Sequence, residues 1–222
     1  MGFYPTGRRF ESYPGYHGFS AIITDMDFKV IIALVSVALT LFGYSFYFRD
    51  IFANKTKPHA YSWLVWASLT AIAFFGQVAD GGGPGAWVTA TTALVSFVIF
   101  GLAIKKGEHN ITVSDKLNLA GAGLALLVWF FTEDPVFSII LITVIDFLGF
   151  VPTIRKSYSK PHEETLIHYV FAGLKFVLAI IALDNYSLTT WLYPASLVVA
   201  NLFFVPMLVI RRRQLADHSK LS

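Results

Sequence analysis

The chain has 222 residues, of which 55% are hydrophobic and 14% are charged, and its mean hydropathy is +0.61. Soluble domains carry about 25% charged residues, so this composition excludes an ordinary soluble fold and favours an integral membrane protein. The absence of cysteine excludes disulfides and thiol chemistry, and the basic residues behind the net charge of +3 lie in short segments, which argues against nucleic-acid binding.

The first 27 residues form a tail ahead of the apolar part of the chain. They are rich in glycine, proline and aromatic residues and include Arg8, Arg9 and Glu11. They lack the continuous apolar run of a signal peptide or a membrane span. We therefore expect residues 1–27 to form an extracytoplasmic or interfacial tail.

Seven apolar runs follow the tail, and each is long enough to be a transmembrane helix. A helix rises about 1.5 Å per residue, so about 20 apolar residues cross a hydrocarbon core of about 30 Å. Glycine, proline and acidic residues separate neighbouring runs, as at Gly81–Gly85 and Glu133–Pro135. The predicted spans are residues 28–48, 60–79, 86–104, 115–132, 135–154, 165–183 and 187–210.

Basic residues gather at alternate connections between these spans. The segments after the first, third and fifth spans each contain three, the segment after the seventh contains four, and the others contain none. Because basic loops stay in the cytoplasm, we expect the N-terminus outside and the C-terminus in the cytoplasm. The short loops favour the plasma (cell inner) membrane. The basic residues are Arg49, Lys55, Lys57, Lys105, Lys106, Lys116, Arg155, Lys156, Lys160, Arg211, Arg212, Arg213 and Lys220.

The second half of the chain repeats features of the first half. The matching pairs are Gly43–Arg49 with Gly149–Arg155, Lys57–His59 with Lys160–His162, Asp80 with Asp184, and Trp87 with Trp191. Their offsets all lie between 103 and 106 residues, which indicates an internal repeat of a three-helix unit.

Both copies place their basic loop on the same side, so the two units are parallel. A three-helix unit repeats in parallel only when an odd number of helices lies between the copies, and the fourth span is that linker. The predicted fold is an all-α membrane protein of seven transmembrane helices, with two parallel three-helix bundles joined by a linker helix. Its predicted parts are the tail at 1–27, the first repeat at 28–106, the linker at 107–134, the second repeat at 135–213 and a cytoplasmic tail at 214–222.

This arrangement resembles the SWEET sugar transporters and the wider PQ-loop superfamily. The run from Lys55 to Ser62 resembles the Thr-Lys-Ser stretch that follows the first helix in that family. Pro152 stands where the second repeat has the proline of its proline–glutamine pair, and Thr153 replaces the glutamine. The resemblance covers residues 28–213 and implies transport of a sugar-like solute. Nicotinamide-riboside vitamin transporters share the architecture, so a vitamin or nucleoside is the alternative solute.

Two ionisable residues lie near the middle of predicted spans, Asp146 in the fifth and Lys175 in the sixth. A charge at the bilayer centre costs roughly 2.5–3.5 kcal/mol on insertion scales, so both should face the interior of the bundle. Counted from the loop that joins the fifth and sixth spans, the two residues lie at similar depths in the membrane. We therefore expect Asp146 and Lys175 to form an ion pair. The pair is either a coupling site whose charge changes during a proton-linked cycle or a structural pair in the second bundle.

Four residues are candidates for solute binding. Asn201 lies where the resemblance implies a substrate-binding asparagine, and Ser96 stands at the corresponding place in the first repeat. Trp66 and Tyr169 correspond at the 103-residue offset, in helices that supply aromatic pocket walls in that family. The alternatives are an interhelical hydrogen bond for Asn201 and packing or interfacial roles for the rings.

Pro152 is predicted to kink the fifth span and to act as a hinge, because proline removes a backbone hydrogen bond. No convergent nucleophile, base or metal-ligand set is visible, so we expect neither an enzyme nor a cofactor or metal site. The predicted function is transport of a small polar solute by alternating access. A membrane sensor or assembly factor is the non-transport alternative, and a homo-oligomer is left open.

Overall fold

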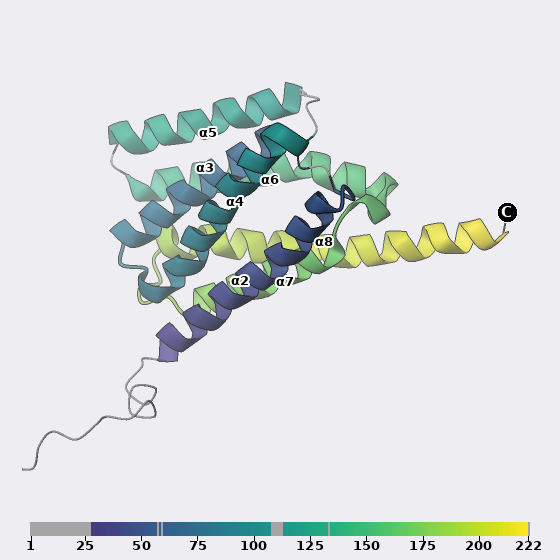
Figure 1. Cartoon of the computed structure of the whole chain (residues 1–222). Coiled ribbons are helices and arrows are strands. Elements are labelled where there is room, and N and C mark those ends of the chain that lie inside the picture. Colours follow the sequence, from purple (N-terminus) through teal and green to yellow (C-terminus); the bar gives the residue numbers. More distant parts are fainter. Residues whose placement is uncertain (1–27, 57, 59, 108–112, 133, 222) are drawn as a thin grey trace, which may run out of the picture.

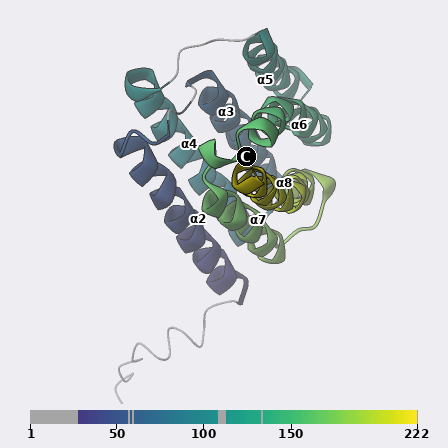
Figure 2. The same ribbon diagram turned by 90° about the vertical axis from the view of Figure 1, so that its right-hand side faces the viewer.

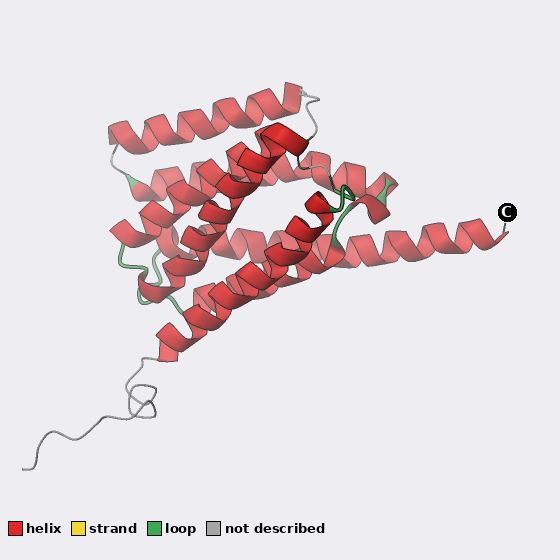
Figure 3. Cartoon of the chain, in the orientation of Figure 1, coloured by secondary structure: helices red, strands yellow, loops and turns green. Residues whose placement is uncertain are grey.

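The computed structural model describes residues 28–56, 58, 60–107, 113–132 and 134–221. Within these residues the chain forms seven α-helices and two short 3₁₀ helices, and no strand (Figures 1 and 3). The predicted all-α fold class is therefore confirmed. The predicted tail at residues 1–27 lies outside the described residues, as do Lys57 and His59 of the repeated turn.

The helices begin and end close to the predicted spans. They are α2 (Phe28–Phe52), α3 (Ala60–Ala79), α4 (Ala86–Lys106), α5 (Val113–Thr132), α6 (Pro135–Ser159), α7 (Leu166–Ile181) and α8 (Leu188–Leu221), with η1 at Gly83–Gly85 and η2 at Pro161–Glu163. α3 matches its predicted span at both ends, whereas α2, α4 and α6 continue past theirs. α8 differs most, because it continues through the segment predicted as a tail and projects from the bundle (Figure 1).

The length and composition of the helices are those expected of a multi-pass membrane protein. Four segments among the described residues are long and apolar enough to cross a membrane: α2, α3, Gly83–Lys106 and Leu188–Ala216. α6 and α7 each contribute a shorter apolar stretch. Large apolar side chains lie on the outside of the bundle, where Leu94 is 68% exposed and Phe203 is 74% exposed. A surface of this kind is suited to lipid rather than to water.

Hydroxyl side chains inside these apolar helices are bonded to the backbone of their own helix. Thr40 donates to the carbonyl oxygen of Ser36 at 2.8 Å, and Thr143 donates to that of Ile139 at 2.6 Å. Hydrocarbon offers no hydrogen-bonding partner, so a backbone carbonyl of the same helix satisfies these hydroxyls in place of water.

Successive helices run in opposite directions, so the connections alternate between the two ends of the bundle (Figure 1). The C-terminal ends of α2, α4, α6 and α8 lie at one end, on the right in that view. We call it the basic end, because Arg49, Lys105 and Lys160 lie at or next to the ends of α2, α4 and α6, and Arg211 of α8 is hydrogen-bonded to the carbonyl oxygen of Tyr158 near the end of α6. The C-terminal ends of α3, α5 and α7 lie at the other end, which we call the acidic end.

The helices pack in the same order in the two halves of the described chain, α2–α4 and α6–α8. α4 packs against both α2 and α3, and α8 packs against both α6 and α7. Across the halves, α2 packs on α7 and α3 packs on α6. α5 packs on α6 and α3 at the edge of the bundle, and Figure 2 shows it beside α6.

An apolar core joins the halves where α3, α6 and α8 meet. Its buried members are Val65, Leu69, Ile72, Ala73, Ile139, Ile142, Ile145 and Tyr193. Lipid tails are as apolar as these side chains, so close packing, rather than removal from water, is the main stabilising interaction here.

Gly85 marks a close approach between the start of α4 and the end of α7. A Cβ atom at this position would lie 2.6 Å from the carbonyl oxygen of Ala179 and 2.9 Å from the amide nitrogen of Leu183. Because these backbone atoms cannot move aside, Gly85→Ala should destabilise the fold by about 1–3 kcal/mol. The measurement is thermal unfolding in detergent. Gly101→Ala is the matched control, since a Cβ there meets nothing within 4 Å, and equal losses for both variants would contradict this packing.

Candidate functional site

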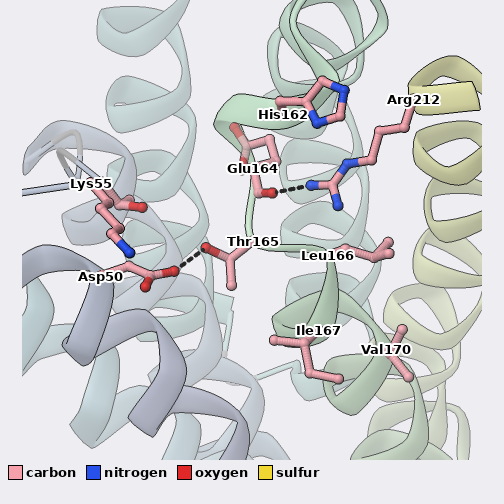
Figure 4. A pocket seen from close by; sticks show the side chains of 10 residues that line it. Asp50, Lys55, His162, Glu164, Thr165, Leu166, Ile167, Val170 and Arg212 are labelled. Atoms are coloured by element: carbon pink, nitrogen blue, oxygen red, sulfur yellow. Dashed lines mark hydrogen bonds between the residues drawn. The ribbon is translucent and has the colours of Figure 1, made fainter. Parts of the chain in front are cut away.

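A pocket of about 430 Å³ opens at the basic end of the bundle (Figure 4). The end of α2 and the segment after it form one wall, and η2, the start of α7 and α8 form the other, so the pocket lies between the two halves. Its volume is in the range of small-molecule sites, about 300–1,000 Å³. The lining residues are Asp50, Lys55, Thr56, His162, Glu164, Thr165, Leu166, Ile167, Val170 and Arg212.

Hydrogen bonds hold the polar wall of this pocket in place. Thr165 Oγ1 donates to Asp50 Oδ2 at 3.2 Å, which links the start of α7 to the end of α2. Arg49 donates two bonds to the other oxygen of Asp50, at 3.1 and 3.0 Å. Arg212 reaches from α8 and donates to the carbonyl oxygen of Glu164 at 2.6 Å (Figure 4). Three segments that are distant in the sequence therefore fix one pocket.

The pocket presents charged, hydroxyl and apolar groups together. Lys55 and Arg212 are basic, and Asp50 and Glu164 are acidic. Three apolar residues from the first turns of α7 complete the lining. A few placed polar groups beside an apolar surface are typical of sites for small polar molecules with an apolar face.

Aromatic side chains from both halves meet next to the pocket. We call Tyr44, Tyr47, Trp63, Trp66, His168, Tyr169 and Phe204 the aromatic cluster. Tyr169 donates to Glu164 Oε2 at 2.9 Å, which joins the cluster to the pocket wall. The His168 ring lies 4.9 Å from the Tyr44 ring and 5.5 Å from the Tyr47 ring, which joins α7 to α2. These spacings are favourable for aromatic pairs.

The two predicted aromatic site residues lie at different places in this cluster. Trp66 packs edge-on against Trp63 with 5.4 Å between ring centres, and Tyr169 packs 4.5 Å from Phe204. Neither Trp66 nor Tyr169 lines the 430 Å³ pocket. Their role in solute binding stays a prediction.

Ser96 and Asn201 are both buried inside the bundle. The side chain of Ser96 lies next to that of Tyr44 in the aromatic cluster. Asn201 Nδ2 donates to the carbonyl oxygen of Leu197 at 2.7 Å, while its Oδ1 has no partner among the described residues. A buried open acceptor can bind a solute hydroxyl. Solute binding by Asn201 and Ser96 also stays a prediction.

The predicted ion pair between Asp146 and Lys175 is wrong for this conformation. Neither residue belongs to an ion pair within the described part of the chain. Lys175 Nζ donates to Thr92 Oγ1 of α4 at 2.9 Å and lies 4.7 Å from the centre of the Tyr44 ring of α2. Asp146 instead lines a small cavity beside α3. Both residues lie near the middle of their helices, but the two helices turn them toward different neighbours.

Lys175 is 2% exposed and is held by groups from several helices. Its Nζ lies 4.8 Å from the centre of the Phe176 ring as well as over Tyr44, and Ser36 donates to its carbonyl oxygen at 2.6 Å. The faces of aromatic rings attract cations, so these two rings replace part of the lost hydration. Among the described residues, Lys175 Nζ donates a hydrogen bond only to Thr92.

α6 continues through residue 152 and ends at Ser159. The side chain of Pro152 lies outside the described residues, so its role as a hinge stays a prediction.

At the acidic end, contacts between the halves close the bundle. Lys29 Nζ of α2 lies 3.3 Å from Asp184 Oδ1, after α7. Ser187 Oγ donates to Asp80 Oδ2, and Asn185 Nδ2 donates to the carbonyl oxygen of Asp80 at 2.8 Å. Asp80 and Asp184 are equivalent residues of the predicted repeat, and each contacts the opposite half. We call this set of contacts the closed end.

The pocket was not among the predicted sites. Asp50 and Glu164 are acidic residues inside otherwise basic segments, and this was the one signal that the sequence offered. Arg212 was interpreted only as a charge that sets the orientation, whereas its guanidinium is bonded to backbone carbonyls of η2 and the residue that follows it.

No protein-family model, curated protein or solved structure matches this chain. The function of the pocket therefore has to be inferred from its own geometry.

Proposed function

We propose that this protein is a multi-pass membrane transporter of a small polar solute, with a sugar-like solute favoured. It moves the solute by alternating access between two three-helix bundles, residues 28–106 and 135–213, which α5 joins as the linker helix. In this proposal all seven helices cross the plasma (cell inner) membrane, with the N-terminus outside and the C-terminus in the cytoplasm.

The packing of the helices supports the two-bundle arrangement. The packed helix pairs are the same when the first half (α2, α3, α4) is exchanged with the second half (α6, α7, α8). Within each half, the third helix packs on the first two. Between the halves, the first helix of each half packs on the second helix of the other half. The alternating directions of the helices support seven crossings, because each connection then returns to the correct side (Figure 1).

One observation supports the proposal of alternating access: a pocket lies between the halves at the basic end, whereas side-chain contacts join the halves at the acidic end. The 430 Å³ pocket has walls from both halves, which the bond from Thr165 to Asp50 links beside it, while contacts of Lys29, Asp80, Asp184 and Ser187 join the halves at the acidic end. A transporter of this kind keeps one side shut while the other is open. With the basic end in the cytoplasm, the conformation is open to the inside.

The order of groups along α7 suggests a path for the solute. From the basic end, Glu164 lines the pocket, His168 and Tyr169 belong to the aromatic cluster, Lys175 follows, and Asp184 lies at the closed end. We propose that the solute enters the pocket and is bound among the predicted residues when the halves rock together. Those residues are Trp66, Ser96, Tyr169 and Asn201, with Asp146 and Lys175 as coupling groups and Pro152 as a hinge.

Uptake into proteoliposomes tests the function. The purified protein is reconstituted and supplied with radiolabelled sugars, nucleosides, nicotinamide riboside and amino acids, with protein-free vesicles as the control. We expect saturable accumulation of one class, with a sugar favoured. Binding of a solute without flux would instead indicate a sensor and would contradict the proposal. Repeating the assay with an imposed proton gradient tests proton linkage, which an unchanged rate would exclude.

A further inference from the structure

Asp146, proposed above as a coupling group, lines a second cavity apart from the 430 Å³ pocket. The cavity has a volume of about 10 Å³ and is lined by Tyr61, Ser62, Val65, Trp66, Ile145, Asp146 and Gly149. Asp146 is 9% exposed, and no described side chain gives it a hydrogen bond or an ion pair. It is thus a buried carboxylate directed into a cavity and without a protein partner.

The charge of this carboxylate limits what can occupy the cavity. An unpaired charge inside a membrane protein is costly, so a compensating positive charge is strongly favoured. Lys175 does not provide it, because its Nζ is directed to Thr92 and the Tyr44 ring. A divalent ion would leave an uncompensated positive charge, whereas a monovalent cation gives a neutral site.

The size and the oxygen atoms of the cavity favour an ion over a proton. About 10–15 Å³ is enough for one water molecule, so a small ion fits and an organic ammonium does not. Tyr61 and Ser62 of α3, which also line the cavity, carry hydroxyl oxygens, and hard cations bind oxygen ligands. A proton on the carboxyl group would need no such space. We propose that Asp146, together with α3 hydroxyls, binds one small monovalent cation, with Na⁺ as the physiological ion.

The cavity lies between α3 and α6, so a bound ion would contact both halves of the bundle. α6 and α3 belong to opposite halves, so an ion held by Asp146 and Ser62 bridges the two. Its binding would change the relative stability of conformations in which the halves are packed differently, because a ligand shifts an equilibrium toward the state that it binds more tightly. This coupling role rests on the proposed transport function, whereas the binding of the ion does not.

Equilibrium binding of ²²Na⁺ to the purified full-length protein in detergent tests the site. We expect saturable binding of one ion per chain, which unlabelled Na⁺ displaces and choline does not. Asp146→Asn should lose the binding. Gly149→Ala keeps the carboxylate but adds a methyl group to a residue that lines the cavity, and should weaken the binding. Asp134→Asn is the matched control, because Asp134 is an exposed carboxylate at the start of α6, where asparagine caps equally well.

The outcomes separate the site from the transport function. Equal ²²Na⁺ binding by wild type and Asp146→Asn would overturn the proposal, as would a thermal stability that responds to pH but not to Na⁺. If Asp146→Asn fails to fold, Ser62→Ala and Gly149→Ala decide the question. If the protein binds ²²Na⁺ but shows no solute flux, the proposed transport function is contradicted and the ion site is not. If the protein transports solute independently of Na⁺ and does not bind ²²Na⁺, the ion site is contradicted and the transport function is not.

Discussion

The double variant Asp80→Cys/Ser187→Cys is expected to lose solute uptake on oxidation and to recover it on reduction. Ser187 Oγ is hydrogen-bonded to Asp80 Oδ2 across the two halves, so the short side chains meet at their tips. A disulfide needs Cβ atoms about 3.5–4.5 Å apart, so its formation is verified before uptake is measured. Because alternating access requires the closed end to open in every cycle, the disulfide should reduce uptake to the level of protein-free vesicles.

The natural sequence simplifies this experiment, because it contains no cysteine. The two introduced thiols are then the only ones in the chain, and disulfide formation can be followed by thiol labelling. The single variants Asp80→Cys and Ser187→Cys are the controls, and oxidant should leave the uptake of each unchanged. Uptake at the full rate by a protein in which the disulfide is verified would show that the closed end is not a gate.

The helices could be predicted from the sequence because their signals are local. Each apolar run is bounded by residues that end a membrane helix, as at Asp80 and Gly81 after α3 and at Pro135 at the start of α6. α3 was consequently predicted with both of its ends correct. The extension of α8 was missed, because a polar segment outside the membrane gives no hydropathy signal for a helix.

The direction in which a buried residue faces could not be predicted in the same way. Counting along the helices gives the depth of Asp146 and Lys175, but not the rotation of α6 and α7 about their axes. That rotation depends on packing, for example on Gly43 of α2, where a Cβ would lie 2.9 Å from Cβ of Phe171. This close contact brings α7 against α2 and turns Lys175 toward Tyr44 and Thr92.

The pocket was beyond prediction for a related reason. Arg212 binds the carbonyl oxygens of Pro161 and Glu164, which lie 51 and 48 residues earlier in the chain. Thr165 donates to Asp50, which lies 115 residues earlier. No pattern of spacing indicates such pairs, because the site is formed by the meeting of helix ends that belong to different halves.

Lys175→Met is expected to retain or increase the stability of the fold while it abolishes coupled uptake. Lys175 is buried and has no carboxylate partner among the described residues. Only its hydrogen bond to Thr92 and its contacts with two aromatic ring faces therefore offset the cost of removing its charge from water. Replacing a buried charged group by an apolar side chain of similar length is often neutral or stabilising by about 1–4 kcal/mol. We expect the unfolding temperature in detergent to stay the same or rise.

Thr92→Val is the matched variant and is expected to have the opposite effect on stability. It removes the hydrogen-bond acceptor of Lys175 Nζ but leaves the charge in place, which should cost about 1–3 kcal/mol. In the Lys175→Met background the same change should cost little, since no ammonium group is left without a partner, and a double-mutant cycle measures this difference. If Lys175→Met destabilises the fold as much as Thr92→Val, the lysine is a structural element of the bundle. A stable Lys175→Met protein that no longer transports would instead show that the charge is retained for function, because an apolar side chain would serve the fold as well.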